Sequence, residues 1–95
     1  PIIKNKDMKT KFLYIEVVET NGEREYTHRV LREVSSQITN ITSWADKNIA
    51  AGIYGDKPKN VDGKWEYNDG EVICELYKVM EITKLQYEVL TKFIQ

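Results

Sequence analysis

The chain has 95 residues, of which 41% are hydrophobic and 31% charged, and its formal net charge is −1. This length fits one domain, and the content of aromatic and β-branched residues excludes a disordered chain. The charge lacks the basic excess that is typical of nucleic-acid-binding domains. No apolar run approaches the roughly 20 residues that span a bilayer.

The first eleven residues are expected to form an N-terminal extension, and residues 12–95 a single α+β domain. Met8 resembles a natural translation start, which would make residues 1–7 an addition to the native chain. An ordered tail of this kind has to pack on its own domain or on a neighbour. The extension carries the one local concentration of basic side chains, namely Lys4, Lys6, Lys9 and Lys11.

Cys74 is the only cysteine of the chain. A single cysteine cannot form an intrachain disulfide, and this usage suits a reducing compartment. No secretion signal is recognisable either. The sequence therefore predicts a cytoplasmic protein.

Residues 12–34 predict a β-hairpin. Its first half is rich in β-formers, its second half alternates polar with apolar residues, and Asn21-Gly22 between them suits a type I′ turn. With those two residues as the loop, His28 lies opposite Ile15 on the side expected to face the core. A slip of one residue would mix the two faces, so the alternation specifies which side chains point inward.

An amphipathic helix is predicted next, capped by Ser35 or Ser36 and running to about Ala51. Its apolar residues recur at steps of three and four, with Trp44 beside them: Ile38, Ile41, Ala45, Ile49 and Gly52. Residues 56–63 are expected to form a polar loop.

A second hairpin is predicted around Asp69-Gly70, another type I′ signal. This turn places Tyr67 opposite Val72 and Trp65 opposite Cys74. The inward face is expected to hold seven residues, interrupted by Lys78: Trp65, Tyr67, Val72, Cys74, Leu76, Met80 and Ile82. The opposite face reads Ile73, Glu75, Tyr77, Val79 and Glu81.

The final segment opens with Thr83-Lys84-Leu85-Gln86, which fits a capping box and predicts a helix start. A core-facing stripe is expected from Leu85, Val89 and Phe93, joined by Leu90 and Ile94. The predicted fold is therefore α+β with the order ββαββα. It would form a four-stranded, mostly antiparallel sheet with both helices packed on one face.

Such an arrangement would leave the second face of the sheet without cover from its own chain. Open antiparallel sheets normally present polar residues to water, and contiguous apolar patches mark contact sites. The sequence therefore predicts a non-enzymatic interaction protein that forms a homodimer or binds a protein partner. Alternatively, sheet twist or the N-terminal tail buries the same residues without a partner. The candidate interaction residues are Phe12, Tyr14, Val18, Arg29, Leu31, Ile73, Tyr77 and Val79.

No pattern predicts a catalytic residue, a metal site or a cofactor. His28 is the only histidine, so it cannot belong to a multi-histidine metal site, and an inward position fits a hydrogen-bonded packing residue. Cys74 is also expected to point inward, where a reactive thiolate is disfavoured. Asp56 and Asp62 belong to no more than a fragment of a calcium loop, because no bidentate glutamate follows at the expected distance.

Two further functions remain open. Aromatic rings on an exposed sheet can stack single-stranded bases, and Phe12, Tyr14 and Tyr77 would supply them, although glutamates on the same face oppose a nucleic-acid backbone. A small-ligand or enzymatic pocket would be built from Trp44, Tyr54 and Trp65. The layout of hairpin, alanine-containing helix and second hairpin resembles small uncharacterised proteins of bacteria and their phages.

Overall fold

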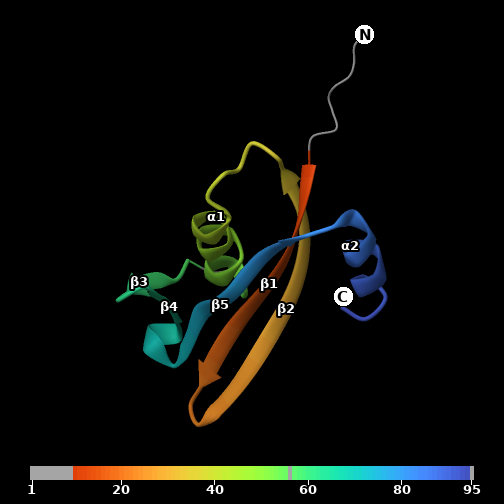
Figure 1. Cartoon of the computed structure of the whole chain (residues 1–95). Coiled ribbons are helices and arrows are strands. Elements are labelled where there is room, and N and C mark those ends of the chain that lie inside the picture. The colour runs from red at the N-terminus through yellow and green to blue at the C-terminus, as the bar shows by residue number, and fades with distance from the viewer. Residues whose placement is uncertain (1–9, 56, 95) are drawn as a thin grey trace.

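The computed structural model describes residues 10–55 and 57–94. Five strands form one antiparallel sheet in the order β2-β1-β5-β4-β3 (Figure 1). The strands are β1 Thr10–Asn21, β2 Arg24–Ser35, β3 Lys59–Val61, β4 Lys64–Tyr67 and β5 Val72–Ile82. The helices are α1 Ile41–Asn48 and α2 Lys84–Leu90, and two short 3-10 segments are η2 Ala50–Gly52 and η3 Asn68–Gly70. The α+β class with an antiparallel sheet and two helices is confirmed.

Parts of two predictions lie outside the described residues. Most of the expected extension, with Lys4, Lys6 and Lys9, belongs there, as does Asp56 of the calcium-loop fragment. Thr10 and Lys11 are described, and both belong to β1.

β3 lies where the sequence predicts a polar loop. It pairs with β4 through Asp62-Gly63, whose φ angles of 53° and 84° fit a type I′ turn. All three residues of β3 are exposed, so they lack the apolar alternation by which a half-buried strand is recognised. The predicted four-stranded sheet and the order ββαββα are therefore wrong, and the order is ββαβββα.

The hairpin of β1 and β2 keeps the predicted faces in a different register. Asn21 pairs with Arg24, so Gly22 opens the loop, and His28 lies opposite Val17 instead of Ile15. Gly22 has a φ of 65°, as the first central position of a type II′ turn requires. Moving the turn by one residue shifts each cross-strand pair by two residues, which leaves every side chain on its predicted side.

The core lies between β1 and the segment of α1 and η2. Leu13, Ile15 and Val17 alternate along β1 and are fully buried, and they belong to the same cluster as Ala45 and Ala50. Their common orientation follows from the two-residue period of a strand. We call this side of the sheet the inner face and the opposite side the outer face.

α1 is shorter than the predicted helix. β2 continues through Ser35, so the expected serine cap does not form, and Asn40 caps the helix instead by accepting a hydrogen bond from the Ser43 N–H at 2.9 Å. α1 ends at Asn48 and η2 continues the chain. The competing strand pairing with β1 therefore decided where the helix begins.

The second hairpin has the predicted register. Tyr67 pairs with Val72 and Trp65 pairs with Cys74. Between them the chain makes a four-residue connection, in which Asn68, Asp69 and Gly70 all have positive φ. Asparagine, aspartate and glycine tolerate this backbone region best.

A β-bulge in β5 changes which side chains point inward. Glu16 pairs with Lys78 but Val17 pairs with Leu76, so Tyr77 has no counterpart on β1. One extra residue on one strand reverses the alternation beyond it. The interruption that Lys78 makes in the predicted apolar pattern marks this place.

Beyond the bulge the predicted inward set is wrong. Met80 pairs with Tyr14 and Ile82 pairs with Phe12, which places Met80 and Ile82 on the outer face. Val79 pairs with Ile15 and packs against the core cluster. Val79 therefore does not belong to the predicted interaction face.

The two helices lie on opposite faces of the sheet (Figure 1). α1 covers the inner face, whereas α2 packs over β1 on the outer face, where the Tyr87 ring lies 4.8 Å from the Phe12 ring between centroids. The prediction that both helices share one face is wrong. Because the bulge turns Ile82 outward at the end of β5, the chain leaves the sheet on its outer side.

The start of α2 is the predicted capping box. The Thr83 hydroxyl accepts from the Gln86 N–H at 3.0 Å, and the Gln86 side chain accepts from the Thr83 N–H at 2.8 Å. We expect Thr83→Ala to destabilise α2 by about 1 kcal/mol, because one N–H loses its acceptor. Amide hydrogen exchange should rise in residues 84–90 and stay unchanged in β1. Equal acceleration in both elements would contradict this local role.

Candidate functional site

The outer face holds most of the predicted interaction residues, but it is partly covered. Leu31 is buried, and the Phe12 ring packs in a tilted contact against Tyr87 of α2. Tyr77 is 68% exposed at the bulge. The residues whose pairing places them on the outer face are Phe12, Tyr14, Val18, Arg29, Leu31 and Ile73.

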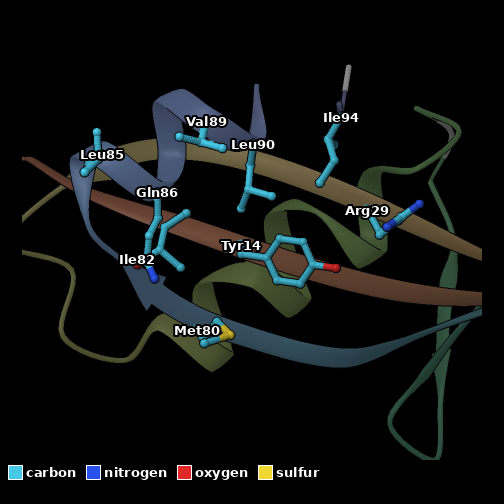
Figure 2. Close-up of a pocket in the computed structure, with 9 residues that line it drawn as sticks. All are labelled: Tyr14, Arg29, Met80, Ile82, Leu85, Gln86, Val89, Leu90 and Ile94. Carbon is cyan, nitrogen blue, oxygen red and sulfur yellow. The ribbon is translucent and has the colours of Figure 1, made fainter. Parts of the chain in front are cut away.

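An apolar groove of about 550 Å³ lies between α2 and the outer face (Figure 2). In Figure 2 Leu90, at the end of α2, and Ile94, from the chain after it, point toward Tyr14 on β1. The Tyr14 hydroxyl donates to the Glu16 carboxylate. The groove is lined by Tyr14, Arg29, Met80, Ile82, Leu85, Gln86, Val89, Leu90 and Ile94.

The apolar stripe of α2 is largely exposed to solvent. Leu85 is 70% exposed, Val89 46% and Phe93, just after the helix, 77%. Met80 on β5 is exposed beside the same groove. The prediction that this stripe faces the core is wrong, because the less exposed residues are Tyr87 and Leu90 of α2 and Ile94 after it. We call Met80, Leu85, Val89 and Phe93 the α2 surface.

The three residues of the predicted pocket, Trp44, Tyr54 and Trp65, make separate contacts. Trp65 donates from Nε1 to Asp46 Oδ1 at 2.9 Å, and both tryptophans pack against the core cluster. Tyr54 lies edge-to-face with Tyr67 and donates its hydroxyl hydrogen to Glu19. None of the three lines the groove beside α2.

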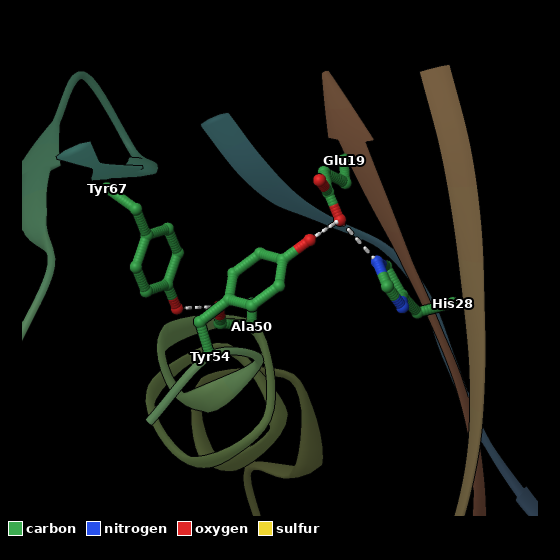
Figure 3. Close-up of polar contacts among 5 residues, drawn as sticks. All are labelled: Glu19, His28, Ala50, Tyr54 and Tyr67. Carbon is green, nitrogen blue, oxygen red and sulfur yellow. Dashed lines mark hydrogen bonds and ion pairs between the residues drawn. The ribbon is translucent and has the colours of Figure 1, made fainter. Parts of the chain in front are cut away.

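A buried carboxylate stands at the centre of a polar cluster on the inner face (Figure 3). Glu19 is only 2% exposed, and its Oε1 accepts from the Tyr54 hydroxyl and lies 2.7 Å from His28 Nε2. Tyr67 completes the cluster by donating to the Ala50 carbonyl at 3.0 Å. These contacts connect η2 to β4, and they connect the segment after η2 to β1 and, through His28, to β2.

Burial raises the pKa of Glu19, but the hydrogen bonds from Tyr54 and His28 outweigh it, so the pKa lies below its ordinary value. Glu19 is therefore ionised at neutral pH. The same bond to Glu19 raises the pKa of Tyr54 to about 12. Since an ionised carboxylate can only accept, His28 carries its proton on Nε2.

Glu19 is absent from the residues that the sequence singled out, although a signal for it exists. It follows Leu13, Ile15 and Val17 at the same two-residue step, and that alternation places its side chain on the inner face. A glutamate in that position needs buried hydrogen-bond donors. Those donors come from β2 and from residue 54, whose approach the local pattern does not reveal.

Cys74 is fully buried and pairs with Glu19 on the neighbouring strand. Burial, with the Glu19 charge, raises the pKa of its thiol to about 11. We expect a thiol probe to label the folded protein at least about a hundredfold more slowly than the unfolded protein, because the thiolate is the reacting form. Labelling rates with and without urea measure this on the single cysteine. Rapid labelling without denaturant would show that Cys74 is accessible.

Within residues 10–55 and 57–94, no group of three or more histidine, cysteine, aspartate or glutamate side chains is placed to hold a metal ion. Neither helix of the described part of the chain is long and apolar enough to cross a membrane. No family model matches the chain, and no curated protein or solved structure is significantly similar to it.

Proposed function

We propose that this chain is a non-enzymatic interaction protein that forms a homodimer through the α2 surface. The observation that carries the proposal is the outward stripe of α2, with Leu85 70% and Phe93 77% exposed. Scattered exposed apolar residues are ordinary, whereas neighbouring ones beside an apolar groove mark a contact site. The predicted interaction face thus moves from the bare sheet to the helix that covers it.

The apolar area suits a stable interface. Together, the exposed parts of the four side chains offer on the order of 400 Å². An interface of standard size needs about 800 Å² per partner, of which somewhat more than half is apolar. The α2 surface therefore supplies most of the apolar part of one standard interface.

The charges beside this stripe favour a second copy as the occupant. Lys84 and Glu88 of α2 and Lys92 after it are exposed and follow one another at four-residue steps. A dimer interface with a twofold axis must be complementary to itself. Two antiparallel copies bring lysine of one chain toward Glu88 of the other when the twofold axis passes beside Gln86 or Leu90, whereas a rim of one sign would repel its copy at any position of the axis.

Solution mass across a concentration series tests the proposal. Sedimentation equilibrium should show a reversible change from monomer to dimer, with a midpoint in the micromolar range. A monomer at all concentrations up to about 1 mM would overturn homodimerisation. A cytoplasmic location is part of the same proposal, because the only thiol is unpaired and buried.

Single-stranded nucleic-acid binding on the outer face has weaker support. The Phe12 ring is in tilted contact with Tyr87, and Tyr14 is hydrogen-bonded to Glu16. A base that stacked on Phe12 would first have to displace α2. A salt-dependent mobility shift with a short oligonucleotide would separate this function from dimerisation.

A further inference from the structure

A second cavity, of about 320 Å³, lies on the inner face beside the edge strand β2. Its walls are β2, the end of α1 and η2, and it is lined by both polar and apolar side chains. This volume matches small-molecule sites, which usually begin near 300 Å³. This cavity is separate from the α2 groove, because the two have only Arg29 in common among their lining residues.

Four residues with polar side chains line this cavity, namely His28, Arg29, Arg32 and Asn48, of which Arg29 also lines the α2 groove. Arg32 uses Nη1 to donate to the Leu31 carbonyl at 2.8 Å, which leaves further N–H groups of its planar fork for a ligand. Asn48 donates to the Trp44 carbonyl at 2.9 Å and keeps a second amide hydrogen. No carboxylate is among the lining residues, so the cavity has a cationic wall.

His28 is the member whose geometry suggests binding. Glu19 Oε1 lies 2.7 Å from His28 Nε2, and Figure 3 shows the other nitrogen of the His28 ring pointing away from Glu19. Within the described part of the chain, no recorded hydrogen bond uses that nitrogen, Nδ1. A carboxylate that fixes one ring nitrogen orients the other and stabilises the ring when it becomes a cation.

We propose that His28, Arg32 and Asn48 form a binding site for a phosphate group, either inorganic phosphate or a small phosphomonoester. A guanidinium fork and an imidazolium N–H are donors that suit phosphate oxygens. Binding places a proton on Nδ1, and the buried Glu19 charge balances the cation that results. The apolar lining of Ile49 and Ile53 offers contact to the organic part of a phosphomonoester.

Proton NMR tests this site directly, because His28 is the only histidine and its imidazole signals need no separation from others. We expect titration with inorganic phosphate, and in a second arm with glycerol phosphate, to give a saturating shift of these signals. Sodium chloride at the same ionic strength should give none. Tighter binding in the second arm assigns the organic ligand, and comparable binding in both assigns the phosphate group alone.

Two matched variants separate a built site from general charge attraction. Arg32→Gln should raise the dissociation constant at least about tenfold. Arg24→Gln removes the same charge from the exposed far end of β2. This variant should change the dissociation constant less than about twofold. A shift that never saturates in either arm, or equal losses in the two variants, would overturn the proposal.

Discussion

The double variant Leu85→Glu, Phe93→Glu is expected to be a monomer at concentrations where the unchanged protein is a dimer. Both side chains are mostly exposed in the single chain, so their replacement removes little from the fold itself. In the dimer each copy would lose two apolar contacts and gain two charges that must be desolvated. Since burying one such side chain contributes about 1.5–3 kcal/mol, the dimer dissociation constant should rise at least about a thousandfold.

The matched control is Lys57→Gln, Lys59→Gln, which changes the net charge by the same amount at two exposed positions that do not line the α2 groove. It should remain a dimer, with a dissociation constant altered by less than about tenfold. Leu85→Glu places an acidic side chain in the first turn of α2, where it is favourable to the helix dipole, so circular dichroism should be unchanged. A double variant that keeps the dimer mass would exclude the α2 surface as the interface.

Replacing Glu19 by alanine should cause the largest loss of stability among the polar variants of this chain. Tyr54 and His28 lose their common acceptor, and a buried volume is left empty. Because both donors are partly exposed and regain water, we expect the free energy of unfolding to fall by about 2 kcal/mol at neutral pH. Urea denaturation measures it. Glu25→Ala, an exposed glutamate of β2, is the control and should stay within about 0.5 kcal/mol.

The difference in the free energy of unfolding between wild type and Glu19→Ala should depend on pH in a defined direction. The folded-state pKa of Glu19 is lowered from 4.5, because the hydrogen bonds from Tyr54 and His28 outweigh the effect of burial. Ionised Glu19 therefore contributes stability that is present above pH 4.5 and is lost as the pH falls through the folded-state pKa. The stability difference should shrink on acidification below that value. A difference that grows with acid would contradict an ionised Glu19 in the folded protein.

Tyr54, in the same cluster, determines how the stability should change at alkaline pH. The pKa of Tyr54 is raised from 10 to about 12 by its bond to Glu19 and by burial. Its contribution is present below pH 10 and is lost as the pH rises toward 12. The effect should be small because the Tyr54 side chain is half exposed. Comparison with Tyr54→Phe across this pH range measures it.

The sequence identified most residues of the candidate site, but it did not show that they form one exposed surface. Leu85, Val89 and Phe93 form a recognisable stripe at helical spacing, and the capping box marks where α2 starts. A stripe shows that a helix has an apolar side, but it does not show what that side meets. α2 is only 7 residues long, and its position on the outer face leaves the stripe in solvent.

For the cavity beside His28, the sequence shows even less of which residues meet. Alternation along β1 and β2 places Glu19 and His28 on the inner face, but their distance depends on the register. The loop at Gly22, one residue later than predicted, brings His28 opposite Val17, one pair away from Glu19. Asn48 reaches this region from the end of α1, and Tyr54 reaches it from the chain after η2.

Local patterns were sufficient for the inner face of β1, the pairing of β4 with β5 and the capped start of α2, because each depends on neighbouring residues and on strand or helix periodicity. The tertiary structure alone decided the fifth strand, the beginning of α1 and the side of the sheet that α2 covers. These depend on pairing between distant strands and on one extra residue, Tyr77, in β5. A single bulge reverses the direction of every later side chain in its strand, and its position is defined only by the pairing of that strand with β1.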